Sequence, residues 1–344
     1  MANRTLDYHA GEIVWECHEM RRCECGEADR RSLDTPKKSF VDALAQLSSQ
    51  PTSSVVVTTE GENANKISRK DPQNVWLDIV EGYSKLSLTF ATDRLPALSG
   101  LAQAMASSGP GEESYLAGFW RRDLPIALLW YPSVDGQPIR HGSLTYKSNA
   151  GVTKRNSDIP SWSWVSVSTP VSFPHFGDHH AAARVTARID EICADPVTSD
   201  PYGKCGPGRV VITGPLLAAK LKYNNTKWDK FWVRTTSGLW FAVSPDLDHS
   251  VRGTGYWLNS GTEVRLLVIA RSWAGEDKSH GLILLATGER EGEGERENGG
   301  GREVYRRIGA FERTADARDF PWMYPDVGSR SIFRAEDVRT VVII

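Results

Sequence analysis

Residues 160–167, Pro-Ser-Trp-Ser-Trp-Val-Ser-Val, are the stretch that decides the predicted fold. In an extended strand successive side chains point to opposite faces, so Trp162 and Trp164 share one face. Each indole buries up to about 250 Å² of surface, which allows the pair to anchor a core. Pro160 has no N–H to donate and suits the first residue of a strand. The pattern therefore predicts a strand over residues 162–168, packed by neighbouring strands and a helical segment.

The chain beyond residue 144 has the two-residue hydrophobic period of β-strands. Turn-forming groups such as Asp200-Pro201-Tyr202-Gly203 separate the segments, and no helical pattern lies between them. This arrangement favours an antiparallel sandwich or barrel over a parallel sheet. The other predicted strands cover residues 182–192, 209–213, 216–223, 231–235, 239–243, 263–271, 281–287 and 303–311, with an edge strand at 341–344 and a strand at 12–17 near the N-terminus.

Helical patterns occupy the first half of the chain. Apolar residues recur at i, i+3 and i+4 from Val75 to Tyr83, and Asp93 is placed to cap the helix that follows. The predicted helices cover residues 36–48, a segment starting at Asp71-Pro72, and residues 95–107, 112–120 and 125–130. The predicted fold class is therefore α+β, with a small helical segment followed by an antiparallel β-rich sandwich or barrel-like domain.

Length and charge constrain the class of protein. The 344 residues are typical of about two domains, and the net charge of −2 favours neither nucleic acid nor an anionic membrane. The sequence has no apolar run of about 18 residues and no basic-then-apolar leader. Five cysteines, an odd number, agree with a reducing compartment. We therefore predict a cytoplasmic protein that binds neither nucleic acid nor a membrane; the sequence leaves its oligomeric state open.

Two clusters contain possible metal ligands. Cys17, His18, Cys23 and Cys25 offer thiolates and an imidazole, but five residues and then one residue separate the thiols, unlike the paired knuckles of a structural zinc site. The sequence favours free thiols there. A second cluster, His175, Asp178, His179 and His180, lies in a loop, and the adjacent imidazoles point apart in an extended segment. A titrating surface loop is the favoured interpretation, and we predict no metal site and no cofactor.

Charged residues elsewhere suggest structural roles. Asp93 and Arg94 are expected to cap a helix or form an ion pair, with a buried acid-base pair as the functional alternative. Arg306 and Arg307 are expected to form exposed ion pairs that each contribute about 0 to 1 kcal/mol. Residues 288–303 lack apolar side chains and are predicted to be a disordered, solvated loop, with partner docking as the alternative. The sequence contains none of the common hydrolase, phosphate-loop, zinc-protease or dinucleotide motifs, so we predict no catalytic residue.

Three motifs follow one another in a fixed order and carry a family resemblance. The first runs from Trp76 to Asp93-Arg94-Leu95-Pro96-Ala97-Leu98-Ser99-Gly100-Leu101-Ala102, the second is Tyr115-Leu116-Ala117-Gly118-Phe119-Trp120 with Asp123-Leu124-Pro125 and Leu128-Leu129-Trp130, and the third is Pro160-Ser161-Trp162-Ser163-Trp164. Together they resemble the region downstream of the heterokaryon-incompatibility (HET) domain of fungal proteins. Asp200-Pro201-Tyr202-Gly203 and Tyr305-Arg306-Arg307-Ile308-Gly309 are similar to later parts of that region, and Arg4-Thr5-Leu6, residues 12–17 and Cys23-Glu24-Cys25-Gly26 resemble the end of the HET domain itself.

The three landmarks of the HET domain are missing from this sequence. They are Tyr/Leu-Ser-Tyr-x-Trp-Gly, Asp-x-x-Cys-Ile-Asn-Gln and Arg-Gly-Trp-x-x-Gln-Glu, so no functional residue of that domain is carried over. The resemblance implies that residues 1–34 are a remnant of a HET-type domain. Residues 35–75 are then a helix and linker, residues 76–142 a helical segment and residues 143–344 the β-rich domain.

Three functional hypotheses follow. The leading one is a non-catalytic accessory region that acts through protein-protein contacts in fungal non-self recognition and programmed cell death. The second is an enzyme that consumes a nucleotide cofactor through a missing upstream domain, or that uses a metal held by the cysteine and histidine clusters. The third is a truncated remnant without an independent function, for which exposed apolar surface around Ile13 and Trp15 would be expected.

Overall fold

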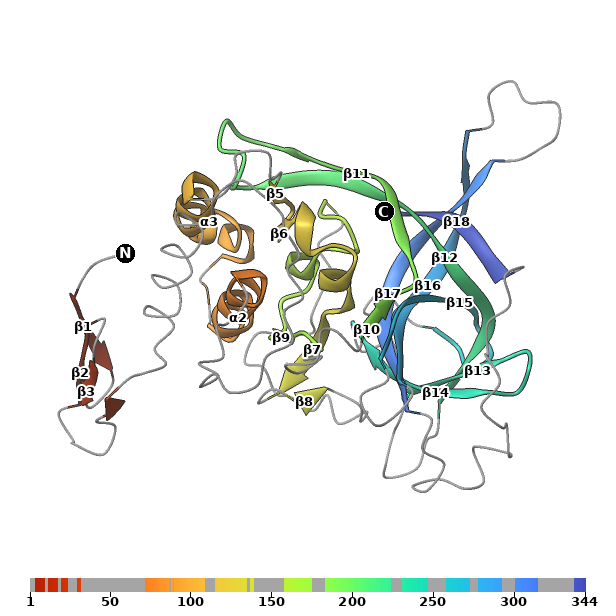
Figure 1. The fold of residues 1–344 in the computed structure, drawn as a ribbon, viewed down its shortest axis with the longest axis horizontal. Coiled ribbons are helices and arrows are strands. Elements are labelled where there is room, and N and C mark those ends of the chain that lie inside the picture. Colours follow the sequence, from red (N-terminus) through yellow and green to blue (C-terminus); the bar gives the residue numbers. More distant parts are fainter. Residues whose placement is uncertain are drawn as a thin grey trace, which may run out of the picture. The chain divides into compact units, whose positions relative to one another are not determined.

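The computed structural model describes residues 4–9, 12–17, 20–23, 30–31, 72–86, 88, 90–108, 115–134, 137–138, 158–174, 183–223, 231–246, 258–272, 278–292, 301–314 and 337–344. The chain forms two compact units, Met1–Tyr83 with Leu98–Glu113 and Ser84–Ala97 with Ser114–Ile344. Strands outnumber helices, which confirms the α+β, strand-rich fold class (Figure 1). The predicted helix at residues 36–48 and the cluster from His175 to His180 lie outside the described residues.

The first unit contains a small antiparallel sheet in the order β1-β2-β3-β4. Its strands are β1 (Arg4–His9), β2 (Glu12–Cys17), β3 (Met20–Cys23) and β4 (Arg30–Arg31). The predicted strand at residues 12–17 is therefore confirmed, and it pairs with a neighbour on each side. Val14 is buried and Ile13 is exposed.

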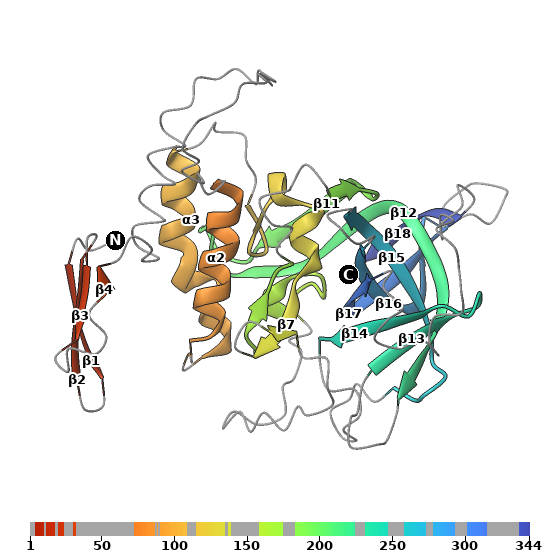
Figure 2. The same ribbon diagram turned by 60° about the horizontal axis from the view of Figure 1, so that its bottom comes forward.

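Helices α2 (Pro72–Ser84) and α3 (Pro96–Ser108) confirm two predicted helices. They lie side by side in both views (Figures 1 and 2). The stripe predicted from the helical period is buried at Val75, Trp76 and Val80 in α2 and at Leu98, Ala102 and Met105 in α3. Hydrophobic periodicity located both helices because each has one apolar face.

The stretch at residues 160–167 is not a strand, so that prediction was wrong. It forms a turn and the 3-10 helix η4 (Trp164–Ser166), although Trp162 and Trp164 are fully buried as expected. The Ser163 hydroxyl accepts the N–H of Val165 at 3.2 Å and donates to the carbonyl of Ala117 at 2.7 Å. Serine side chains that bond to nearby backbone compete with the strand ladder.

The segment before this turn contains short elements. They are β5 (Tyr115–Leu116), β6 (Phe119–Trp120), η2 (Arg121–Asp123), η3 (Ile126–Leu129), β7 (Tyr131–Val134) and β8 (Gln137–Pro138), and β7 also pairs with β9 (Val171–Ser172). The helix predicted at residues 112–120 was wrong, because residues 115–120 form a hairpin whose turn residues Ala117 and Gly118 both have positive φ, 48° and 95°. The short helix predicted at residues 125–130 is the 3-10 turn η3.

Six strands close into an antiparallel barrel, in the cyclic order β12-β15-β16-β17-β14-β13. Figure 1 looks almost along its axis. The members are β12 (Cys205–Tyr223), β13 (Phe231–Thr235), β14 (Trp240–Pro245), β15 (Glu263–Ser272), β16 (Lys278–Glu291) and β17 (Arg302–Thr314). The barrel interior is filled by alternate, mostly aliphatic residues that include Leu221, Val233, Phe241, Leu266 and Ile283. Strands at predicted positions therefore build a closed barrel, whose core does not include Trp162 or Trp164.

Three further strands extend this sheet: β10 (Ala183–Val185) pairs with β15, and β11 (Arg188–Pro196) and β18 (Val338–Ile343) both pair with β12. Strand β18 also pairs with β17 in parallel, so the predicted edge strand has a neighbour on both sides. The two strands predicted at residues 209–213 and 216–223 are one bent strand, β12 (Figure 2). The predicted disorder of residues 288–303 was wrong for the described ends, where Arg290 pairs with Glu303; residues 293–300 lie outside the described part.

Candidate functional site

Parts of all three motifs that carry the family resemblance lie in the second unit, where they contact one another. The Arg94 guanidinium donates to the carbonyl of Val167 and lies over the ring of Trp164, 5.0 Å from its centroid. The indole N–H of Trp164 donates to the carbonyl of Gly118 at 3.2 Å. Asp93, in contrast, is exposed at the end of a 3-10 turn. Arg94 therefore supports the buried tryptophan and does not form a buried acid-base pair with its neighbour.

A second set of contacts joins the same motifs to one another and to the β11–β12 hairpin. The indole N–H of Trp130 donates to the carbonyl of Trp162 at 2.8 Å, and Phe119 stacks on Trp162 at 6.4 Å between centroids. Tyr202, in the turn between β11 and β12, packs edge-on against Tyr115 at 5.5 Å. The β11–β12 hairpin accordingly reaches to β5 (Figures 1 and 2).

Arg307 is fully buried and joins the barrel to the preceding segment. Its guanidinium forms two hydrogen bonds of 3.0 Å with the Asp246 carboxylate, from Nε to Oδ2 and from Nη2 to Oδ1. It also donates to the carbonyls of Leu128 and Trp130 and lies 3.5 Å from the centroid of the Trp130 ring. The Ser161 hydroxyl accepts the Arg307 backbone N–H. The prediction of an exposed ion pair was therefore wrong for Arg307, which has no exposed side-chain surface.

These contacts explain why the motifs occur together. Residues far apart in the sequence share hydrogen bonds and ring contacts, for example between Trp130 and the Trp162 carbonyl and between Arg307 and Asp246. The arrangement is a structural scaffold, because its side chains are buried and contact one another.

The predicted metal ligands lie at the margin of the described chain. Cys17 and Cys23 end strands β2 and β3, but the structure describes neither side chain, and His18 and Cys25 lie outside the described residues. Within the described part of the chain, no three histidine, cysteine or acidic side chains form a group that fits a metal ion.

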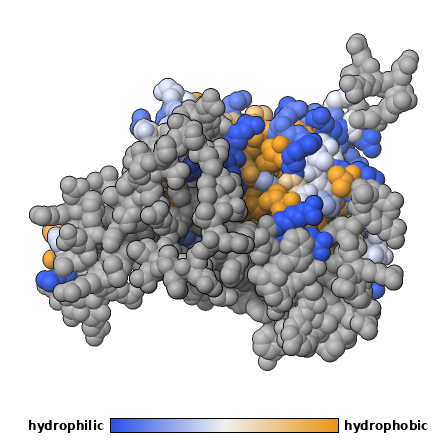
Figure 3. All heavy atoms as spheres, in the orientation of Figure 1, coloured by the Kyte–Doolittle hydropathy of each residue, from blue (hydrophilic) through white to orange (hydrophobic). Residues whose placement is uncertain are grey.

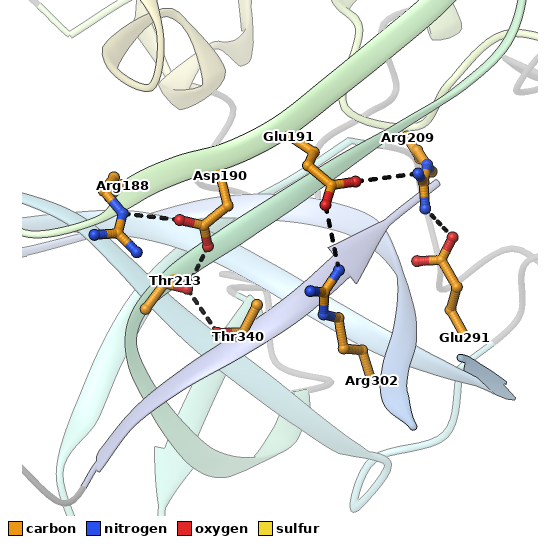
Figure 4. A network of polar contacts seen from close by, with 8 residues as sticks. All are labelled: Arg188, Asp190, Glu191, Arg209, Thr213, Glu291, Arg302 and Thr340. Carbon is orange, nitrogen blue, oxygen red and sulfur yellow. Dashed lines mark hydrogen bonds and ion pairs between the residues drawn. The ribbon is translucent and has the colours of Figure 1, made fainter. Parts of the chain in front are cut away.

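One exposed polar network joins β11, β12, β16, β17 and β18 (Figure 4). Arg209 contacts the carboxylates of Glu191 and Glu291, and Arg302 lies 3.7 Å from Glu191. The hydrogen bond from Thr213 is the main factor that holds the pKa of Asp190 below its ordinary value. The members are Arg188, Asp190, Glu191, Arg209, Thr213, Glu291, Arg302 and Thr340. Three arginines balance three carboxylates, so this network supports the strand pairing and attracts neither sign of ligand.

A second polar region is a cavity of about 460 Å³ on the outside of the barrel, which we call the basic cleft. The register places Lys220 opposite both Arg234 on β13 and Glu263 on β15, and Ala218 opposite Arg265. Residues directly opposite one another in a sheet share a face. The cleft is lined by Ala218, Ala219, Lys220, Lys222, Arg234, Thr235, Thr236, Gly238, Glu263 and Arg265.

The charge of the basic cleft is unbalanced. Four cations and one carboxylate line it, whereas the whole chain has a net charge of −2. Glu263 lies 3.6 Å from Lys220, and Arg234 lies over the ring of Trp240 at 5.4 Å. Among the described residues, no carboxylate forms an ion pair with Lys222, Arg234 or Arg265. The cleft is therefore suited to an anionic ligand.

Sequence reasoning missed the basic cleft. The available signal was the alternation of Lys220 and Lys222 with the buried Ala219 and Leu221, which places both lysines on the outer face. Arg234 comes from another strand, and only the cross-strand register brings it to the lysines.

Figure 3 shows one face, on which hydrophilic residues surround a smaller group of hydrophobic ones. The large hydrophobic residues that are exposed in the described part of the chain do not line the basic cleft; they are Leu6, Ile13, Leu86, Leu88, Phe90, Val185, Val197 and Val338. No helix in the described part is long and apolar enough to cross a membrane. Comparisons of the chain with models of known families, with curated proteins and with solved structures found no match.

Proposed function

We propose that this chain is a non-catalytic accessory region of a HET-type protein, acting through protein-protein contacts in fungal non-self recognition and cell-death signalling. The proposal begins from the motifs that resemble the region downstream of the HET domain. Their residues contact one another as a buried scaffold, for example through Arg94, Trp164 and Gly118.

One observation carries the proposal. Central residues of the resemblance, among them Arg94, Trp162 and Trp164, are buried in the protein, while the basic cleft presents an excess of positive charge on the outer barrel face. A rigid scaffold that displays a charged surface is suited to recognition, since charge complementarity steers association and selects partners. On this proposal the protein works in the cytoplasm and binds other proteins, and neither nucleic acid nor a membrane is its ligand.

The test is expression of the chain in a filamentous fungus from an inducible promoter. After hyphal fusion with compatible and incompatible strains, growth arrest is scored with and without induction. We expect induction to change arrest only in the incompatible pairing. Growth arrest of the incompatible pairing that is the same with and without induction would refute a role in non-self recognition and would favour the remnant hypothesis.

A parallel assay addresses the enzyme hypothesis. Purified chain is incubated with nicotinamide and adenine nucleotides, and the nucleotides are quantified by chromatography over time. We expect their concentrations to match those in a protein-free control. Turnover in proportion to the amount of chain, abolished by heat, would replace the non-catalytic proposal with an enzymatic one.

A further inference from the structure

The basic cleft has a definite geometry. Lys220 and Lys222 project from one strand two residues apart, a separation of about 7 Å in an extended chain. Arg234 stands directly across from Lys220 on β13, about 5 Å away in the strand-pairing direction. The cations thus form a short two-dimensional array and not a single point.

The uncharged lining restricts what the cleft accepts. It contributes alanine, threonine and glycine, and no aromatic or large aliphatic side chain. Trp240 lies beside the array, but the Arg234 guanidinium covers its ring. A nucleobase would need an open aromatic face for stacking, and an apolar side chain would need an apolar pocket. The cleft has neither an open aromatic face nor an apolar pocket, whereas a carboxylate requires only cationic hydrogen-bond donors, which the cleft provides.

We propose that the basic cleft binds an extended acidic segment of a protein partner, with carboxylates on alternate residues. Such a segment spaces its carboxylates about 7 Å apart, which equals the spacing of Lys220 and Lys222. Arg234 offers its N–H edge to a carboxylate while its face stays on Trp240. The inference rests on the proposed function, because it names the class of partner that the recognition surface takes.

Glu263 sets the polarity of the cleft. It pairs with Lys220 at 3.6 Å and lies on β15, at one side of the array. An acidic segment is repelled from that side and is drawn toward Lys222 and Arg234, which have no carboxylate partner in the described chain. The acidic segment therefore lies over β12 and β13.

The experiment measures binding of a fluorescein-labelled octapeptide of alternating Glu and Ser to the full chain by fluorescence anisotropy. Three competitors are the octapeptide with Gln in place of Glu, an oligothymidylate with the same number of charges, and inorganic phosphate. We expect the acidic peptide to bind and to lose at least tenfold in affinity in about 0.5 M salt, because exposed charges are screened. The glutamine peptide should not bind.

Two double variants locate the site. Lys222→Glu with Arg234→Glu should weaken binding at least tenfold, whereas Arg184→Glu with Lys204→Glu makes the same charge change at exposed positions outside the cleft and should change binding less than threefold. If the first variant does not fold, the neutral pair Lys222→Gln with Arg234→Gln replaces it. Equal loss in both double variants would overturn the cleft as the site and indicate a general charge effect.

The competitors decide the ligand class. Tighter binding of the oligothymidylate than of the acidic peptide, or displacement of the peptide by inorganic phosphate at equal charge concentration, would overturn an acidic segment as the ligand. A chain that binds no acidic peptide but still changes growth arrest would refute this inference alone. A chain that binds the peptide through the cleft but leaves growth arrest unchanged would refute the proposed function alone.

Discussion

The buried pair of Arg307 and Asp246 allows a demanding test of the scaffold. Asp246→Asn preserves size and removes the charge that faces a fully buried guanidinium. Removing one partner of a buried pair costs about 3 to 5 kcal/mol, because the remaining charge has lost its compensation. We expect a reduction of that size in the free energy of unfolding.

Arg307→Lys tests the geometry at constant charge. An ammonium group cannot reproduce two parallel bonds to Asp246 together with bonds to the carbonyls of Leu128 and Trp130. Each buried carbonyl left without a donor costs about 1 to 3 kcal/mol, and a buried cation-ring contact contributes about 2 kcal/mol. The expected loss is therefore about 3 kcal/mol or more.

The assay is urea unfolding at pH 7, followed by tryptophan fluorescence and by far-UV circular dichroism. Arg306→Lys is the matched control, since the neighbouring arginine is only half-buried, and its cost should stay below about 1 kcal/mol. The double variant Arg307→Met with Asp246→Leu should be more stable than Arg307→Met alone or Asp246→Leu alone, because each single variant leaves one buried charge without its partner. Equal midpoints for Arg307→Lys and Arg306→Lys would refute our account of the buried guanidinium.

Four further predictions concern single residues. Trp164→Ala should lower the free energy of unfolding by about 3 to 5 kcal/mol, because the indole is fully buried, and an unchanged thermal midpoint would contradict this. Gly118→Ala should lower the free energy of unfolding by at least about 2 kcal/mol more than Gly238→Ala does. Both glycines have positive φ, but only at Gly118 would a Cβ lie 2.4 Å from the Trp164 indole nitrogen; comparison of the urea midpoints of the two variants tests this. Burial raises the pKa of the Cys205 thiol to about 11, so iodoacetamide at about pH 8 should leave it unmodified in the folded chain and label it in urea, as peptide mass mapping will show. Burial, and after it a hydrogen bond to the Glu303 carboxylate, raises the pKa of Tyr305 to about 12. The contribution of the neutral Tyr305 to stability is therefore present below about pH 10 and is lost as the pH rises toward 12. In urea unfolding at several alkaline pH values, a Tyr305→Phe variant should lose stability less steeply than the unchanged chain.

The sequence predicted those elements whose burial follows a local period. Helix α2 was located because Val75, Trp76 and Val80 form one buried stripe, and the barrel strands because inward residues such as Leu221 and Val233 alternate with outward ones. These patterns depend on neighbours in the sequence, so they can be recognised without knowledge of the tertiary fold.

The sequence did not predict features that depend on distant partners. The alternation around Trp164 fits a strand equally well, and the turn is stabilised in its place by bonds to distant residues, such as those from Ser163 to the Ala117 carbonyl and from Trp164 to the Gly118 carbonyl. Arg307 resembles an exposed residue in the sequence, because Asp246, its compensating charge, lies 61 positions away. The pairing of strand β18 with β17 was not predicted either, because the two strands are also far apart in the sequence.

The basic cleft and the scaffold lie on one face of the barrel. Ala218 is opposite Arg265, Arg265 is opposite Leu284, and Leu284 is opposite Arg307, so a single cross-strand row leads from the cleft to the buried guanidinium. Arg307, at the end of this row, donates to the carbonyls of Leu128 and Trp130 in the segment that precedes the barrel. Arg265 of the cleft and the buried Arg307 thus stand in one cross-strand row, two strands apart, so the strand register of one barrel places both the exposed charge and the buried scaffold.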